Sequence, residues 1–321
     1  MKYLSIYLKE SYGGGTQVLN KVSDTLGAKK IYLFEGSIKK SLRNILELKK
    51  EKQKIKLLSD PIAGIILFIF RINFVRFIQG KDTIYFDKNY NWIINSIYKF
   101  LYKLSFNQTV IYNSDFIKNW VSTNFKKTQL IGKISPGTNY KFYKLDKQYD
   151  YVYIFRKDGW KNTKMLINNI RSFTQNEKLL IINSDRLELS FLKKNISCKI
   201  EIHDHFVSLQ ELNIFFSKSK FFISTTLDEG FGMPALEAMA SGCLPIVPSI
   251  GGTSDFCIDK INSIMFINND NVSFEKALNF ARGLDKKNYE MMVDKAHKRS
   301  LDFTWSNTAD NTSFIKNKYF E

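Results

Sequence analysis

Residues 228–242 read Asp228-Glu229-Gly230-Phe231-Gly232-Met233-Pro234-Ala235-Leu236-Glu237-Ala238-Met239-Ala240-Ser241-Gly242, and they join a short apolar run, Phe221–Ile223, to a helical pattern. Gly230 and Gly232 let the backbone turn sharply and approach a ligand closely. Pro234 suits the first turn of a helix, where its missing N–H costs little. The exposed N–H groups at this helix start, together with the helix dipole, are predicted to form an anion site suited to phosphate.

Two carboxylates flank this predicted anion site: Glu229 in the loop before the helix and Glu237 one turn inside it. A carboxylate repels phosphate but accepts hydrogen bonds from sugar hydroxyl groups. The expected ligand therefore has an anionic centre and hydroxylated ends, which describes a nucleotide-sugar. The structural alternative is a helix whose glutamates only complement its amino-terminal dipole.

The run Glu229 to Glu237 resembles the E-x7-E motif of glycosyltransferase family 4, whose members are retaining enzymes with the GT-B fold. The resemblance implies that Glu229 contacts the transferred sugar and Glu237 the nucleotide ribose. It also implies that the backbone of the intervening residues holds sugar and phosphate, and these residues are Gly230, Phe231, Gly232 and Met233.

Three further segments resemble parts of the same family. Arg156 and Lys161 follow a predicted strand, Tyr151–Phe155, at the spacing with which the family grips the donor diphosphate. Two cations on one diphosphate also stabilise the charge that develops as the sugar bond breaks. A segment expected beside the nucleotide base contains Phe206 and Val207. A segment expected beside the donor phosphate contains Gly14 and Gly15.

Two departures from the family pattern concern the reacting centre. Phe155 stands where the family usually has a glycine before the arginine. Many members also carry a histidine in the amino-terminal domain, whereas the three histidines here all lie in the second half. Asp87, at the end of the predicted strand Thr83–Phe86, is the candidate replacement, with an ordinary strand-end aspartate as the alternative.

Short β-branched or aromatic runs alternate with helical patterns along the whole chain, which predicts parallel sheets with helices on both faces. Two sets of about six strands predict two doubly wound α/β domains, as the resemblance to the GT-B fold also implies. We expect an acceptor-binding domain over 1–145 and a donor-binding domain over 146–304, facing a central cleft. A helix over 305–321 is expected to pack back on the first domain.

Charge is distributed unevenly between the two halves. Residues 1–150 contain 26 Lys and Arg against 11 Asp and Glu, a net charge of +15 out of +17 for the chain. Such a field attracts acidic lipid or diphosphate-linked acceptors, while a Lys-rich genome is the alternative cause. The candidate membrane-facing elements are Lys49, Lys50, Lys52 and Lys54 with a predicted helix over Pro61–Phe77, for which a core-facing helix is the alternative.

These features predict a metal-independent retaining glycosyltransferase that needs no cofactor. It would move a hexose from a nucleotide-sugar to a glycan or polyprenyl-diphosphate-linked acceptor in bacterial-type surface polysaccharide synthesis. Three scattered cysteines and a first strand at the amino terminus favour a cytoplasmic protein, peripheral at the inner face of the plasma membrane.

Two other classes of protein compete with this reading. The first is a non-catalytic nucleotide or nucleic-acid binder that uses the basic first domain, although aromatics interleaved with basic residues on one face are not evident. The second is a Rossmann oxidoreductase, whose G-x-G-x-x-G spacing Gly13-Gly14-Gly15 does not match.

Overall fold

The computed structural model describes residues 2–10, 14–81, 91–106, 109–156, 159–183, 185–186, 189 and 198–321, without the side chain of Trp160. Asp87, Gly13 and the expected strand Thr83–Phe86 lie outside these residues. The chain divides into two compact units, Met1–Gly137 with Trp305–Glu321, and Thr138–Thr304. The chain thus changes units at Gly137–Thr138, somewhat before the break expected near residue 145.

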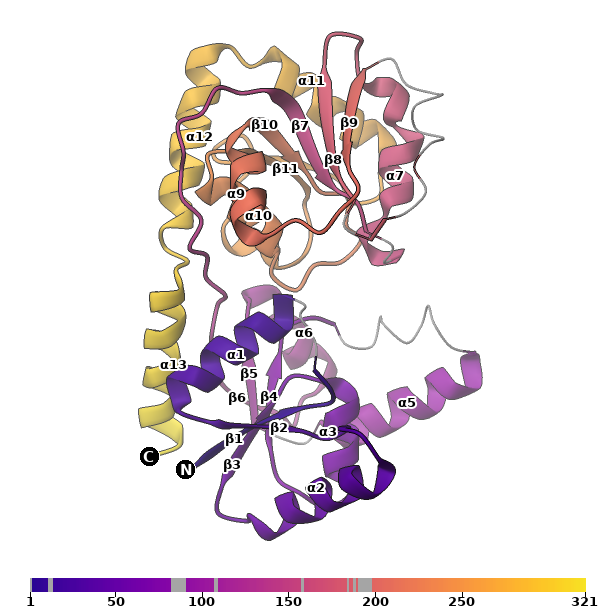
Figure 1. Ribbon diagram of the computed structural model, residues 1–321, viewed down its shortest axis with the longest axis vertical. Helices are drawn as coiled ribbons and strands as arrows, with labels where there is room; N and C mark the ends of the chain where they lie inside the picture. Colours follow the sequence, from indigo (N-terminus) through magenta and orange to yellow (C-terminus); the bar gives the residue numbers. More distant parts are fainter. Residues whose placement is uncertain are drawn as a thin grey trace. The chain divides into compact units, whose positions relative to one another are not determined.

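The first unit is built on a six-stranded parallel sheet with the strand order β2-β1-β3-β4-β5-β6 (Figure 1). Its elements are β1 (Tyr3–Tyr7), α1 (Gly14–Leu26), β2 (Lys29–Tyr32), α2 (Ile38–Lys50), β3 (Ile55–Leu58), α3 (Pro61–Ile69), β4 (Val75–Ile78), α5 (Trp92–Leu104), β5 (Thr109–Tyr112), α6 (Asp115–Asn124), β6 (Gln129–Lys133) and α13 (Trp305–Tyr319).

Two helical layers cover the sheet of the first unit, one on each face. Val18 and Val22 of α1 share a core cluster with Ile315 of α13, so α1 and α13 lie on one face. Helices α2, α3, α5 and α6 cover the other face, where they bury residues such as Ile45 and Leu67. The carboxyl-terminal helix α13 therefore belongs to the first unit and packs on α1, as expected.

The second unit repeats this architecture, with the parallel strand order β12-β11-β10-β7-β8-β9. Its elements are β7 (Tyr149–Ile154), η1 (Gly159–Lys161), α7 (Thr163–Asn168), η2 (Ile170–Ser172), β8 (Lys178–Ile182), β9 (Lys199–His203), α9 (Leu209–Ser217), β10 (Ser219–Ile223), α10 (Met233–Ala240), β11 (Leu244–Pro248), η3 (Gly251–Asp255), β12 (Ile264–Phe266), α11 (Asn271–Gly283) and α12 (Lys286–Ser300). The order reverses between β7 and β10, which is where doubly wound sheets bind ligands.

The helix expected over Pro61–Phe77 is wrong in its second half. Helix α3 ends at Ile69, and the next turn contains Arg71 in the left-handed region, with φ of 55°. Residues 75–78 then form strand β4 in the middle of the sheet. Helix α3 buries Ala63 and Leu67 in the core, which agrees with the core-facing alternative.

A buried arginine explains why the β4 strand is hard to recognise from sequence. Arg76 lies in the middle of β4 and is fully buried, an unusual place for a charge. Its guanidinium carbon lies 4.9 Å from the ring centroid of Tyr102 and 5.1 Å from that of Phe106. It also donates a 3.0 Å hydrogen bond to Ser105 Oγ. Cation–π contacts thus accommodate a charge that interrupts the apolar pattern.

Candidate functional site

The candidate site of the second unit lies at the switch point, where the carboxyl ends of β7 and β10 are adjacent. The two strands pair in register, with Ile223 opposite Tyr153. Arg156 and Lys161 follow β7, while Glu229 follows β10. Strand order therefore brings together two segments that are widely separated in sequence.

A double glycine in η3 fixes the shape of the loop before α10. The N–H of Gly252 donates a 2.8 Å hydrogen bond to the carbonyl of Glu229. A Cβ on Gly251 or Gly252 would collide with the carbonyl of Glu229 or Gly230. Gly251 also has φ of +80°, a conformation that favours glycine. The loop that presents Glu229 is therefore clamped backbone to backbone.

Helix α10 begins directly after this clamped loop. Gly232 precedes the helix with φ of +97°, and Pro234 occupies its first turn, as the sequence predicted. Phe231 is buried, with its ring centroid 5.4 Å from that of Phe256 and 5.7 Å from that of Phe303. The Phe231 side chain thus anchors the loop. Pro234 has no N–H, and the N–H of Ala235 donates to the Gly232 carbonyl at 3.0 Å, so Met233 offers the first-turn N–H that a ligand could meet. Such a helix start is suited to an anion.

Lys161 and Glu229 form the central ion pair of the site. Lys161 Nζ donates to Glu229 Oε2 at 2.8 Å, and the two side chains are 28% and 19% exposed. Thr225 Oγ1 donates to the Lys161 carbonyl at 3.0 Å and contacts the Tyr153 hydroxyl at 2.8 Å. The backbone of Lys161 is therefore held by the end of β10, which the sequence alone did not reveal.

Arg156 lies after β7 but pairs with a different acid. Its Nη1 donates to Asp185 Oδ1 at 3.2 Å, and its side chain is 46% exposed. Thr163 Oγ1 donates to the Arg156 carbonyl at 3.0 Å, which ties this segment to α7. Asp185 follows β8 and was not among the predicted site residues. Both cations predicted to bind a diphosphate are thus paired with carboxylates in this structure.

Glu237 lies inside α10, on the fifth residue of the helix. Although the residue is only half-buried, burial of its carboxyl raises its pKa to about 8. Tyr140 has a buried hydroxyl without a hydrogen-bond partner, and burial followed by the charge of Glu237 raises its pKa. At neutral pH a carboxyl with this pKa is protonated and is able to donate a hydrogen bond as well as to accept one.

The loop between β9 and α9 contains the remaining predicted residues of this unit, Phe206 and Val207. Phe206 is 77% exposed, a large aromatic surface in contact with water. Ser208 and Glu211 then form a reciprocal capping box that starts α9. The loop is thus held at its helical end and presents an aromatic ring, a group on which a flat base can stack.

In the first unit, Gly14 and Gly15 begin α1 at the carboxyl end of β1. Gln79, which directly follows β4, donates to the Gly15 carbonyl at 2.8 Å and to Ser59 Oγ at 2.9 Å. Asn113 Nδ2 donates to the Gln79 carbonyl at 2.9 Å. Gln79 therefore connects the glycine loop to the ends of three neighbouring strands, a role that was missed because β4 was not recognised.

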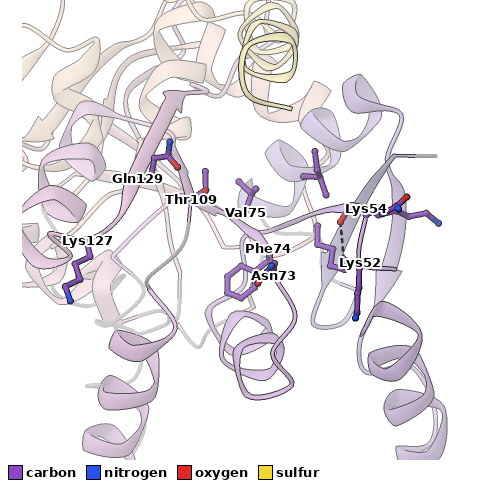
Figure 2. A pocket seen from close by; sticks show the side chains of 11 residues that line it. Lys52, Lys54, Asn73, Phe74, Val75, Thr109, Lys127 and Gln129 are labelled. Carbon is purple, nitrogen blue, oxygen red and sulfur yellow. Dashed lines mark hydrogen bonds between the residues drawn. The ribbon is translucent and has the colours of Figure 1, made fainter. Parts of the chain in front are cut away.

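A separate cavity of about 600 Å³ lies in the first unit at the amino ends of strands β3 to β6, opposite to their carboxyl ends. Figure 2 shows Lys52 and Lys127 on opposite sides of it. Nearby lysines are satisfied by the protein, since Lys56 Nζ donates to the Glu51 carbonyl and Lys54 Nζ pairs with Glu51 at 2.8 Å. Because ligands of parallel α/β sheets bind at carboxyl ends, this cavity is not the candidate site.

Comparison with known proteins points to one family. The family model described as "Glycosyl transferases group 1" matches residues 139–299. An uncharacterized glycosyltransferase of Methanocaldococcus jannaschii, MJ1178, is 26% identical over 71% of this chain and 63% of its own length. The O-antigen chain mannosyltransferase RfbU of Salmonella typhimurium is 31% identical over 39% of this chain and 36% of its own. The matches thus span less than two thirds of either relative.

Solved structures are similar over nearly the whole chain. Sucrose-phosphate synthase from Thermosynechococcus elongatus aligns with a TM-score of 0.81 at 15% identity, covering 99% of this chain and 98% of the other. Anabaena HepE in complex with UDP-glucose aligns with a TM-score of 0.75 at 14% identity, covering 99% of each chain. These similarities confirm the GT-B fold class with its two parallel α/β sheets.

Proposed function

The chain belongs to the group 1 glycosyl transferases, and from that premise we propose that it transfers a hexose from a nucleotide-sugar with retention of configuration. The observation that carries the proposal is the Lys161–Glu229 ion pair, held at 2.8 Å beside the start of α10. A cation, a helix start and an adjacent carboxylate match the phosphate and hydroxyl groups of such a donor.

In the proposed mechanism, the donor diphosphate binds Lys161, Arg156 and the N–H groups at the start of α10. Phosphate releases Lys161 from Glu229, and the freed carboxylate accepts hydrogen bonds from the sugar. Glu237 binds the ribose and Phe206 stacks on the base. As the bond from the sugar carbon to the diphosphate oxygen breaks, the oxygen of an acceptor hydroxyl bonds to the same face of that carbon and its proton passes to the departing diphosphate. The cations and the helix start stabilise the negative charge of this leaving nucleotide.

The acceptor is proposed to be a glycan or a polyprenyl-diphosphate-linked glycan, as in bacterial-type surface polysaccharide synthesis. The O-antigen mannosyltransferase among the relatives supports this class of acceptor. The net charge of +15 over residues 1–150 supports a peripheral position on an acidic membrane at the cytoplasmic face. No helix among the described residues has the length and apolarity that crossing a bilayer requires.

A donor screen tests the proposal. The protein is incubated with a panel of nucleotide-sugars that includes UDP-glucose, with and without a lipid-linked glycan acceptor, and nucleotide release is measured. We expect one donor to be turned over. Metal chelators should leave the rate unchanged, because Arg156 and Lys161 supply the positive charge that a metal ion would otherwise bring to the diphosphate. Glu229→Gln is expected to lower turnover at least about 100-fold. Glu275→Gln, an exposed change on α11, serves as the control.

Binding to the same donor tests the role of the lysine separately. Lys161→Ala removes a charge-assisted hydrogen bond to phosphate, so we expect the donor Kd to rise about 10- to 100-fold. Lys164→Ala makes the same charge change on the exposed side of α7 and should leave the Kd unchanged. Equal Kd values for the two variants, measured by calorimetry, would contradict the proposed contact between Lys161 and the diphosphate.

A further inference from the structure

Helix α5 has an exposed apolar stripe along the side that faces away from the core. Its inner side buries Asn95, Tyr98 and Tyr102. Large apolar residues recur at helical spacing on the outer side, and the first turn adds further ones. Together they are Trp92, Ile93, Ile94, Ile97, Phe100 and Leu104, each 44% to 76% exposed. Figure 1 shows the first turns of α5 projecting outward from the helical layer.

Exposing this apolar stripe to water is unfavourable in free energy, so we expect a partner to cover it. Burying one Ile or Phe side chain stabilises by about 1.5–3 kcal/mol, and proteins rarely leave several such side chains exposed in one contiguous row. Ile93, Ile97, Phe100 and Leu104 follow the i, i+4, i+7, i+11 pattern of a single helix face. A core-facing helix would have turned this face inward.

The charge around the stripe identifies the chemistry of that partner. Helix α5 contains no Asp or Glu, whereas Lys99 and Lys103 are both exposed on it. Helix α2, on the same face of the sheet, adds exposed Ile38 and Leu42 among basic residues. Apolar side chains flanked by lysines, with acids absent from α5 itself, complement an anionic lipid surface.

We propose that α5 seats the first unit on an acidic bilayer, lying in the plane of the headgroups with its apolar stripe inserted. Its 13 residues span about 20 Å, too short to cross the hydrocarbon core but sufficient for an in-plane helix. Lys99 and Lys103 would then lie at the level of the lipid phosphates. The inference rests on the proposed function, in which the acceptor is anchored in such a membrane.

The test compares two phenylalanines of equal exposure on opposite faces of the same sheet. Phe100 on α5 and Phe314 on α13 are each 62% exposed. Each is changed to Glu, and binding to vesicles of equal parts phosphatidylcholine and phosphatidylglycerol is measured by flotation. Phe100→Glu is expected to lower the partition coefficient about tenfold or more, while Phe314→Glu remains near wild type. Equal losses, or no loss in either variant, would overturn the proposal.

Further measurements separate docking from catalysis and from protein association. Wild-type binding should fall on vesicles of pure phosphatidylcholine, and equal binding there would contradict the charge argument. A wild-type dimer that Phe100→Glu dissociates in sedimentation, without vesicle binding, would instead assign the stripe to a protein interface. Turnover of a soluble donor without vesicles should be the same in wild type and Phe100→Glu, so a failed donor screen leaves the flotation result interpretable.

Discussion

At the residue scale, burial governs the protonation of Glu237. Burial raises its pKa from the ordinary value of 4.5 to about 8. Between these two values, an unfolded chain loses a proton that the folded protein retains, so folding stability falls as the pH rises through this range. Glu229, by contrast, is held beside the ammonium group of Lys161. Two glutamates eight residues apart are therefore prepared for different hydrogen-bonding roles.

Glu237→Gln should remove this pH-dependent cost. We expect the variant to match wild type in stability near pH 4.5 and to gain progressively up to pH 8. With allowance for partial exposure, the gain is about 1 kcal/mol, or roughly 2–4 °C in Tm. Thermal unfolding across this pH range measures it, with Glu275→Gln as the exposed control. A gain in stability that is independent of pH would contradict the assigned protonation of Glu237. In a separate measurement, donor binding should weaken in Glu237→Ala.

At the scale of elements, the candidate site depends on contact between η3 and the loop before α10. The loop carries Glu229, but its position is set by Gly251 and Gly252, which follow β11. The hydrogen bond from Gly252 to the Glu229 carbonyl joins the two segments at 2.8 Å. Gln79 plays a comparable part in the first unit, where it binds the carbonyl of Gly15. In both units, a neighbouring strand end fixes a glycine-containing loop.

Gly252→Ala should therefore impair the site more than its small size suggests. A Cβ there would overlap the Gly230 carbonyl and approach the Phe231 Cα to 2.5 Å, so the loop must shift. We expect donor Kd to rise about tenfold, together with a loss of about 1–3 kcal/mol in stability. Gly283→Ala is the control, because a Cβ at that position meets nothing within 4 Å. An unchanged Kd, measured by calorimetry, would show that the clamp does not position the donor loop.

At the scale of the whole molecule, the first unit is closed by the two ends of the chain. Residues 305–321 return from the second unit and pack α13 on α1 and β6. Ile315 is 3% exposed and lies above Gly132, where a Cβ would approach its Cγ1 to 2.8 Å. A glycine in β6 thus creates the space that the last helix fills. The stability of the first unit consequently depends on residues that follow the second unit in the sequence.

Ile315→Ala should destabilise the first unit selectively. Removing a buried isoleucine side chain costs about 2–5 kcal/mol, so we expect a lower unfolding temperature for this unit in calorimetry. Nucleotide binding by the second unit should persist, because its candidate residues lie between 138 and 304. Phe314→Ala, at the exposed neighbouring position, provides the control. A matching loss in both variants would mean that α13 is not anchored through Ile315.

The sequence by itself determined the features that depend on nearby residues. Glycine and proline at fixed offsets predict the turn into α10, and apolar periodicity predicts alternating strands and helices, because backbone conformation is set locally. The unequal charge of the two halves is likewise a property of composition. The E-x7-E spacing was enough to suggest the family that the match over residues 139–299 bears out.

Only the tertiary structure decided which distant residues meet. Lys161 contacts Glu229 across 68 residues because β7 and β10 are neighbours, and strand order is not encoded in either segment alone. The β4 strand was hidden because Arg76 breaks its apolar pattern. The rings of Tyr102 and Phe106 and the hydroxyl of Ser105, which accommodate this buried charge, meet it only through tertiary packing. The outward stripe of α5 was equally unreadable, because periodicity shows an apolar face but not which side the core occupies.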